Sequence, residues 1–236
     1  MNNLRKFSTL EDYEEAELVK PAVSLIASDD SVFFDQKDEE EDFGGLTVVY
    51  NVDNEDVDAE VQIFNGGGGS SESESESGGG GALPSRMIVD GNEETPVNSW
   101  RFDTAGEHTV QYEFEDNTVP VGFMAGNAMA TSIIVGDDIE VIAGTEGGSG
   151  AFDGCGNIDT VEVGTGITEI GNYAFNNCMS MTIFSIGAYT PPTLGTDVFA
   201  GHSNDLVIYV PNGEGDSYKY SSGWSDYASC IEENVG

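Results

Sequence analysis

The sequence AFDGCGNI at residues 151–158 recurs as AFNNCMSM at residues 174–181. Every matched position is offset by 23 residues, so that Phe152 corresponds to Phe175 and Cys155 to Cys178. The apolar alternation that follows each copy keeps this offset, and a fainter third copy carries Phe199 close to the next pitch. A fixed period of about 20 to 29 residues, with one short strand per period, is typical of a solenoid of stacked coils.

Burial explains why such coils must stack. One coil cannot cover its own apolar side chains, so it uses the next coil as its cover, and matched residues lie about 4.8 Å apart where strands pair. We therefore predict that Phe152 and Phe175 stack in the core and that Cys155 and Cys178 form a second ladder. Stacked cysteines could form a disulfide, but a packing position favours buried free thiols. Cys230 stands alone.

A longer stretch carries a family resemblance. Residues 167–181 read ITEIGNYAFNNCMSM and closely resemble the BspA-like leucine-rich repeat, whose pattern is roughly VTSIGxxAFxxCxSLTSI. The tail from Thr190 to Trp224 is similar to the end-cap that often closes such arrays. The resemblance spans Val119 to Ile231 and departs from the pattern where residues 144–150 lengthen one coil and where Met replaces Leu. It implies a short solenoid with a C-terminal cap over residues 118–236.

Residues 45–117 are expected to form a separate domain before the repeats. Short strands are predicted at residues 46–50, 57–64, 86–89, 99–102 and 108–114, with a turn at Asp90-Gly91. Five strands in so short a segment predict a small Ig-like β-sandwich, and the segment from MIVDG to HTVQYEF resembles the sandwich that often precedes BspA-like repeats. Residues 66–81, a Ser/Glu run between glycine blocks, predict a flexible loop within it.

The first 37 residues predict a small α+β module, which leaves the fold class mainly β. We expect a strand at residues 4–7, a helix at 10–19, and two further strands at 22–27 and 31–35. The acidic residues 38–44 predict a solvated linker. The opening NLRKF and the later PAVS segment resemble the N-terminal part of virion proteins from phages of Bacteroides-type gut bacteria. This resemblance implies an anchoring module, and the residues expected to contact the capsid are Leu4, Arg5, Lys6, Phe7 and Lys20.

Charge excludes several classes of partner. The 236-residue chain carries 44 acidic and 7 basic residues, a net charge of −37, and four of the bases lie within the first 37 residues. Such a surface repels phosphate backbones and anionic membranes, so neither nucleic acid nor a membrane is an expected partner. No secretory signal is recognisable after Met1, and no apolar run reaches the length of a membrane span, so we expect assembly inside the host cell.

Motifs for catalysis are missing from the sequence. It contains no HExxH, no nucleophile elbow and no phosphate-binding loop, and neither His108 nor His202 has a plausible partner nearby in sequence. We therefore expect no enzymatic activity and no cofactor. Trp100 and Trp224 are expected to be core or cap residues rather than platforms for sugars.

Two acidic clusters are candidates for calcium. Asp53–Asp58 is the denser in oxygen ligands, but it lacks the central Gly and the closing Glu of the EF-hand spacing, so a solvated acidic turn is the default interpretation. Glu72, Glu74 and Glu76 lie in the glycine-rich run, where nothing fixes their geometry.

Two functions from different classes remain. The first is a phage structural protein of the capsid surface, a head fibre or capsid-decorating protein anchored by residues 1–37, homotrimeric, with its repeats projecting outward for adhesion. The second is a tail-associated or cell-surface adhesin that binds a host glycan or protein. The clustering of bases in the N-terminal module favours the virion protein, because that end would dock to an acidic neighbour. A short array with little concave surface points the same way.

Overall fold

The structure, a computed structural model, describes residues 43–65 and 83–234 and, as backbone alone, residues 23–28 and 31–36. The chain divides into two compact units, Met1–Phe43 and Gly44–Gly236. In the first, β1 (Val23–Ser28) and β2 (Ser31–Gln36) pair antiparallel, which confirms the two strands expected there. Several other expectations lie outside the described residues: the strand at 4–7, the helix at 10–19, most of the linker, the loop at 66–81, and the anchoring residues Leu4, Arg5, Lys6, Phe7 and Lys20.

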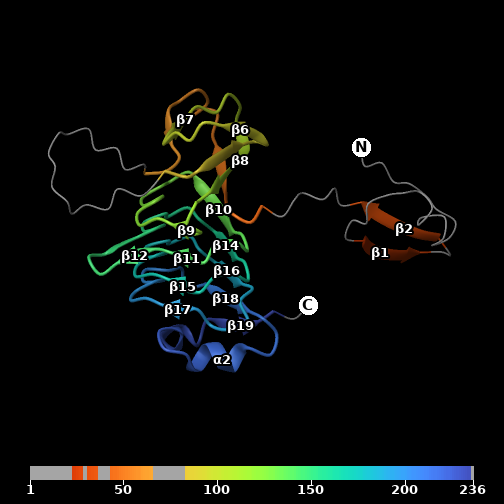
Figure 1. The fold of residues 1–236 in the computed structure, drawn as a ribbon, viewed down its shortest axis with the longest axis vertical. Helices are drawn as coiled ribbons and strands as arrows, with labels where there is room; N and C mark the ends of the chain where they lie inside the picture. Colours follow the sequence, from red (N-terminus) through yellow and green to blue (C-terminus); the bar gives the residue numbers. More distant parts are fainter. Residues whose placement is uncertain (1–22, 29–30, 37–42, 66–82, 235–236) are drawn as a thin grey trace. The chain divides into compact units, whose positions relative to one another are not determined.

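The second unit is built around a nine-stranded sheet, a four-stranded sheet and a C-terminal cap (Figure 1). The large sheet has the order β19-β18-β16-β14-β10-β3-β8-β5-β6. Its strands are β3 Leu46–Val52, β5 Arg86–Val89, β6 Asn92–Glu94, β8 Gly106–Glu113, β10 Ala130–Val135, β14 Thr160–Val163, β16 Ile183–Ile186, β18 Val207–Val210 and β19 Ile231–Glu233.

The smaller elements complete this unit. The four-stranded sheet has the order β17-β15-β11-β9, with β9 Thr118–Val119, β11 Val141–Ile142, β15 Glu169–Ile170 and β17 Thr193–Leu194. Two short antiparallel pairs are β4 Val61–Gln62 with β7 Ser99–Trp100, and β12 Gly144–Thr145 with β13 Ser149–Gly150. The cap contains α2 Gly215–Tyr220 and a 3-10 turn, Trp224–Tyr227.

The repeat region is a β-solenoid of about five turns, as the 23-residue period predicts. Each coil supplies one strand to each sheet: β9 and β10, β11 and β14, β15 and β16, β17 and β18. Successive coils pair in parallel and in register, so that Ile133, Val161, Phe184 and Ile208 form one buried ladder. Stacking the coils lets each apolar row cover the next, which no single coil could achieve.

The phenylalanine ladder is confirmed. The rings of Phe152 and Phe175 stack with centroids 5.1 Å apart and planes 16° apart, and Phe199 stacks on Phe175 at 6.0 Å and 12°. The ladder starts one coil earlier, at Met124, whose N–H donates to Ala151 O just as that of Phe152 donates to Ala174 O. The offset to this first coil is longer because the β12–β13 hairpin lengthens the coil between them.

The cysteine ladder consists of free thiols, as the packing argument favours. The Sγ of Cys155 donates to Met124 O at 3.0 Å, and that of Cys178 to Phe152 O at 3.4 Å. Burial raises the pKa of the Cys155 thiol to about 12 and the pKa of the Cys178 thiol still further. Both are therefore protonated packing groups with little thiolate to react.

Glycine allows the coils to approach closely at one corner. A Cβ on Gly171 would lie 2.4 Å from the backbone nitrogen of Gly144, and one on Gly150 would lie 2.0 Å from Tyr173 O. Any larger residue there would push the coils apart, which explains the Ile-Gly pair of the repeat pattern.

The expected separate Ig-like sandwich over residues 45–117 is not what the described residues show. β3 pairs antiparallel with β8 on one side and with β10 of the first coil on the other, so these strands extend the solenoid sheet. The first coil has no preceding coil, and an uncovered strand edge and apolar end are costly; β3 covers both. One continuous core results, in which Phe64 stacks on Phe123 with centroids 5.0 Å apart.

Some expected strands are shorter than predicted. Residues 57–64 contain only β4, because the preceding acidic residues form consecutive turns, and residues 99–102 contain only β7. The Asp90-Gly91 turn is confirmed: φ is 49° at Asp90 and 78° at Gly91, which is typical of a two-residue hairpin, here linking β5 to β6.

The C-terminal cap closes the far end of the core. Trp224 is fully buried, and its Nε1–H donates to Pro192 O at 2.8 Å, while the hydroxyl of Tyr218 donates to Ala188 O at 2.6 Å. The two rings meet edge to face at 4.9 Å, and Trp224 also packs near Phe199 of the last coil. Trp224 is therefore a cap residue, as expected.

Candidate functional site

The nine-stranded sheet has one buried and one outward face. Along its strands burial alternates: Ile133 and Phe184 are fully buried, whereas their neighbours Ile134 and Ile183 are exposed. We call the two central rows of outward positions on the seven strands from β5 to β18 the outer sheet face; Asn51, Arg86, Glu107 and Glu113 face outward on the same strands beyond these rows. It comprises Thr47, Val49, Ile88, Thr109, Gln111, Ser132, Ile134, Thr160, Glu162, Ile183, Ser185, Val207 and Tyr209.

Strand register arranges the outer sheet face in two rows. The first row crosses seven strands as Ile88, Gln111, Thr47, Ile134, Glu162, Ser185 and Tyr209. The second crosses six strands as Thr109, Val49, Ser132, Thr160, Ile183 and Val207. With neighbouring strands about 4.8 Å apart, the first row spans roughly 29 Å.

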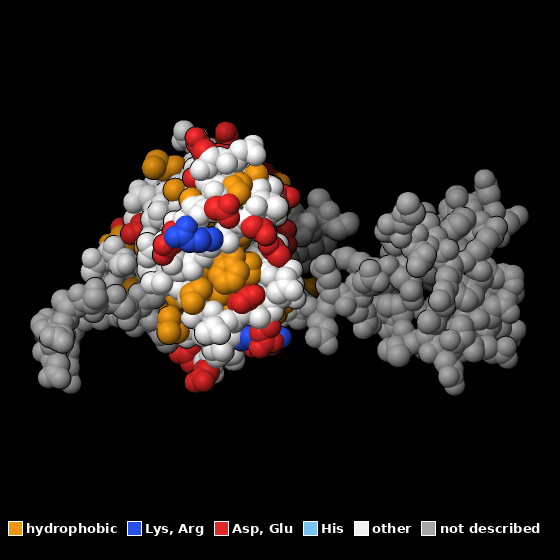
Figure 2. Space-filling view, turned by 90° about the horizontal axis from the view of Figure 1, so that it is seen from above, with side chains coloured by type: hydrophobic (Ala, Val, Ile, Leu, Met, Phe, Trp, Pro, Cys, Tyr) orange, Lys and Arg blue, Asp and Glu red, His pale blue; other side chains and the backbone are white. Residues whose placement is uncertain are grey.

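Glu162 is the one charged residue within the two rows of the outer sheet face, in a chain with 44 acids, although Arg86, Glu107 and Glu113 border the rows on β5 and β8. The other twelve positions carry apolar, hydroxyl or amide side chains, and Ile134 and Ile183 are 42% and 38% exposed. Acids are frequent elsewhere: Figure 2, which looks onto the end near β6 and β7, shows acidic side chains between small hydrophobic patches. A broad, nearly uncharged strip on so acidic a protein is typical of a contact surface.

The arginine side chains of the second unit are paired with nearby carboxylates. Arg86 pairs with Glu113 at 2.8 Å and with Glu93 at 3.1 Å, and Arg101 pairs with Glu60 at 3.1 Å. The guanidinium charges are thereby matched locally, so none is left over to neutralise the acidic surround of the outer sheet face. That face carries no Cys, His or Lys, and it can recognise a partner by packing and hydroxyl hydrogen bonds.

His108, for which no partner was expected nearby in sequence, has a side-chain partner 18 residues away. Its Nδ1 lies 2.7 Å from Asp90 Oδ2 and its Nε2 2.9 Å from Thr104 O, and the ring packs on Phe102 at 4.5 Å. Burial alone would lower the pKa of His108, but the hydrogen bonds to Asp90 and to the Thr104 carbonyl outweigh it and raise the pKa. The imidazolium thus ties the β5–β6 turn to β8.

Asp90→Asn is expected to lower the pKa of His108 and to remove its pH-dependent stabilisation. Because the folded pKa is raised, that stabilisation is complete below the unfolded pKa of about 6.5 and is lost as the pH rises through the folded pKa. The variant should therefore lose more unfolding free energy at about pH 6 than at about pH 8.5. Asn can keep the bond from the Thr109 N–H that Asp90 Oδ1 accepts at 2.9 Å.

The measurement is a proton NMR titration combined with urea unfolding. The chain has two histidines, so two ring signals suffice to follow His108, with His202 as the internal control. An unchanged His108 midpoint in Asp90→Asn would contradict the assignment.

The remaining candidate residues from the sequence can also be located in the structure. Asp53–Asp58 lies in consecutive turns, and within residues 43–65 and 83–234 no group of three or more His, Cys, Asp or Glu is placed to hold a metal ion. Glu72, Glu74 and Glu76 lie outside the described part. Trp100 is partly buried against the core, as expected for a core residue. No helix in the described part is long and apolar enough to cross a membrane.

Comparison with known families agrees with the ladders and the parallel stacking of coils. Residues 127–219 match the BspA type leucine-rich repeat region, in six copies. No curated protein matches the chain. BspA-type repeat arrays are generally non-enzymatic scaffolds for interactions, which indicates a surface or adhesion-type protein.

Two features of the BspA-type array escaped the sequence analysis. The first coil at Met124 was missed because its offset is longer, although its Gly126 has the same positive φ as Gly154 and Gly201 of later coils. The outer sheet face was missed because its residues are the polar half of each apolar alternation. Reading those intervening residues across the repeats, Glu162 against Ser185, would have found part of it.

Proposed function

We propose that this protein is a non-enzymatic adhesion protein whose outer sheet face binds a host protein or glycan. The observation that carries the proposal is the two-row strip of Ile, Val, Thr, Ser, Gln and Tyr side chains, within which Glu162 is the one charge. The strip is longer than the repeats alone could provide, because β3, β8 and β5 continue the sheet. This weakens the sequence argument that a short array offers too little surface.

The rows also suit the physics of recognition. Exposed β-branched side chains on paired strands are held in few rotamers, so little side-chain entropy is lost on contact. The hydroxyls of Ser132, Thr160 and Ser185 lie among them and supply donors and acceptors for a glycan or for polar groups of a protein. Acids beyond the strip disfavour anionic partners.

The test is binding of the labelled full chain to Bacteroides-type cells and to a glycan array. The double variant Ile134→Glu, Ile183→Glu places two charges in the two rows, and we expect it to lose at least about tenfold in binding. Tyr189→Glu and Tyr220→Glu, at exposed aromatic side chains outside the strip, serve as controls for added charge. Equal binding by wild type and the double variant would contradict the proposal.

A second, more specific candidate function is that of a phage head fibre or capsid-decorating protein. Two observations favour it: Met1–Phe43 is a compact unit distinct from the rest, and four of the seven bases lie within the first 37 residues. In this proposal, Leu4, Arg5, Lys6, Phe7 and Lys20 anchor the chain on the capsid, and the second unit presents its outer sheet face outward. A homotrimer would multiply weak anchoring contacts through effective concentration.

The virion role is tested with empty capsids and light scattering. The full chain should bind capsids and have the light-scattering mass of a trimer, and a chain starting at Gly45 should lose capsid binding. Lys6→Glu should weaken attachment, whereas Lys219→Glu, the same charge reversal in α2, should not. A strict monomer at low and high salt that does not bind capsids would contradict the virion role and leave adhesion as the only proposed function.

A further inference from the structure

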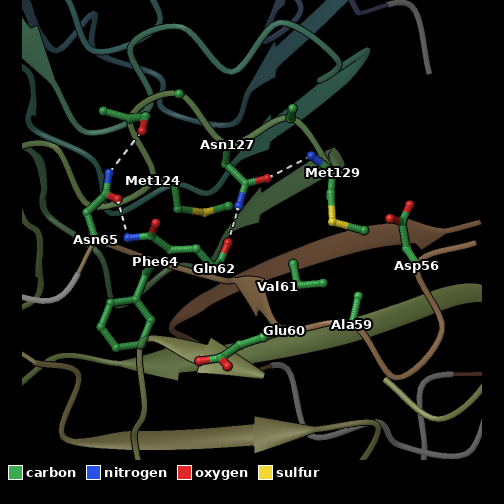
Figure 3. Close-up of a pocket in the computed structure, with 13 residues that line it drawn as sticks. Asp56, Ala59, Glu60, Val61, Gln62, Phe64, Asn65, Met124, Asn127 and Met129 are labelled. Atoms are coloured by element: carbon green, nitrogen blue, oxygen red, sulfur yellow. Dashed lines mark hydrogen bonds between the residues drawn. The ribbon is translucent and has the colours of Figure 1, made fainter. Parts of the chain in front are cut away.

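A cavity of about 280 Å³ opens beside the first coil of the solenoid (Figure 3). Its walls are the segment Asp56–Asn65, which includes β4, and the turn Met124–Met129. One water molecule occupies about 30 Å³ in the liquid, so the cavity has room for a small ligand group. None of its lining residues belongs to the outer sheet face.

The cavity exists because the first coil has no predecessor. In later coils the corner packs directly against the next coil, as Phe152 does on Phe175. Here the segment Ala59–Asn65 takes the place of a preceding coil, but β4 pairs with β7 and not with the coil. The two walls are joined at a few points: the Asn65 backbone N–H donates to Phe123 O, the Asn65 side-chain amide to Gly122 O and Ala125 O, and the Asn127 amide to Gln62 O. Between these points the walls stand apart.

The inner wall of the cavity is apolar. Phe64 and Met124 are 1% exposed and Val61 is 6% exposed, and the partly buried Met129 packs against the same core. Figure 3 shows the thioether chains of Met124 and Met129 on one side and Val61 and Phe64 on the other. Such a lining suits an unbranched aliphatic chain, because methionine side chains adapt to its shape.

The donors that line the cavity are already used. The amide groups of Asn65 and Asn127 donate to backbone carbonyls, and Gln62 Nε2 donates to Asn65 Oδ1 at 2.8 Å. The lining contains no Lys, Arg or His. An anionic ligand would therefore find no free side-chain donor and would face acidic side chains.

Two side chains that line the cavity have hydrogen-bond acceptors that remain free. Within the described residues, Asp56 forms no side-chain hydrogen bond or ion pair, and Gln62 Oε1 has no partner. Glu60, by contrast, already accepts from Ser99 Oγ at 2.9 Å and pairs with Arg101. The cavity thus combines an apolar wall with a carboxylate at its rim.

We propose that this cavity binds a lysine side chain of a partner protein. The four-carbon stem would lie along Met124 and Met129, and the ammonium would donate to the Asp56 carboxylate, which lies beyond Met129 at one end of the cavity. Lysine fits better than arginine, because its compact ammonium satisfies one carboxylate without needing a second planar acceptor pair. The partner therefore has a basic surface, as expected for a binder of a chain with net charge −37.

The probe is Nα-acetyl-lysine amide, added to the full chain labelled with ¹³C at its methionine methyls. The chain has six methionines, and Met124→Leu and Met129→Leu assign the two signals of interest. At about 0.15 M salt we expect saturable shifts of both, with a Kd on the order of 1–10 mM. Nα-acetyl-norleucine amide has the same stem without the charge and should bind at least about threefold more weakly.

The matched variants are Asp56→Asn, which removes the rim carboxylate, and Asp53→Asn, which removes a nearby acid that does not line the cavity. Asp56→Asn should weaken lysine-amide binding roughly three- to tenfold and leave norleucine-amide binding unchanged, and Asp53→Asn should change neither. Equal binding of both probes, equal effects of both variants, or no saturable shift of Met124 and Met129 would each overturn the proposal.

Discussion

Phe175→Ala is expected to lower the free energy of unfolding by about 3–5 kcal/mol, because it removes the central ring of a stacked column and leaves a cavity. Phe175 is fully buried, stacks on Phe152 at 5.1 Å and on Phe199 at 6.0 Å, and meets Phe184 edge to face at 5.4 Å. The neighbouring coils contact each other through this ring, so the loss should fall on the middle of the solenoid. Urea unfolding followed by circular dichroism measures it.

Tyr189→Ala is the matched control for this prediction. It deletes an aromatic ring from the following coil, but Tyr189 is 69% exposed, so we expect a change within about 0.5 kcal/mol. Phe175→Leu, which keeps most of the volume, should lie between the two. Equal loss in Phe175→Ala and Tyr189→Ala would show that the stacking register is wrong.

Trp224→Ala should have an effect of similar size, about 3–5 kcal/mol, at the C-terminal end. The substitution removes the ring that packs on Tyr218 and Phe199 and leaves Pro192 O without the indole donor. Trp224→Phe keeps a six-membered ring but removes the indole donor and part of the volume, so its loss should be smaller than that of Trp224→Ala and at least about 1–3 kcal/mol, the cost of an unpaired buried acceptor.

Hydrogen exchange locates this loss. In a stack of coils that contact only their neighbours, removing the cap should expose β18 and β16 to exchange before β3 and β8. Tyr220→Ala, at a side chain that is 84% exposed in the same cap, should leave exchange unchanged. Uniform acceleration across the large sheet would contradict this end-to-end order.

The repeat determined the solenoid from sequence alone. Because a coil must be covered by its neighbour, the 23-residue offset was enough to predict that Phe152 lies on Phe175, that Cys155 lies beside Cys178, and that the strands of successive coils pair at matched positions. The Asp90-Gly91 hairpin was equally local, since two positive φ angles at adjacent positions require residues of this kind. Each of these features depends on short-range pattern.

Only the tertiary structure decided what covers the first coil. A strand such as β3 reads the same in a sandwich and at the edge of a solenoid; it pairs with β10 because that edge and the apolar end below it would otherwise be exposed. The long outer sheet face and the cavity beside Met124 follow from that docking, and the contact between His108 and Asp90 follows from the pairing of β5 with β8. These contacts join residues far apart in sequence, and no period or local motif encodes them.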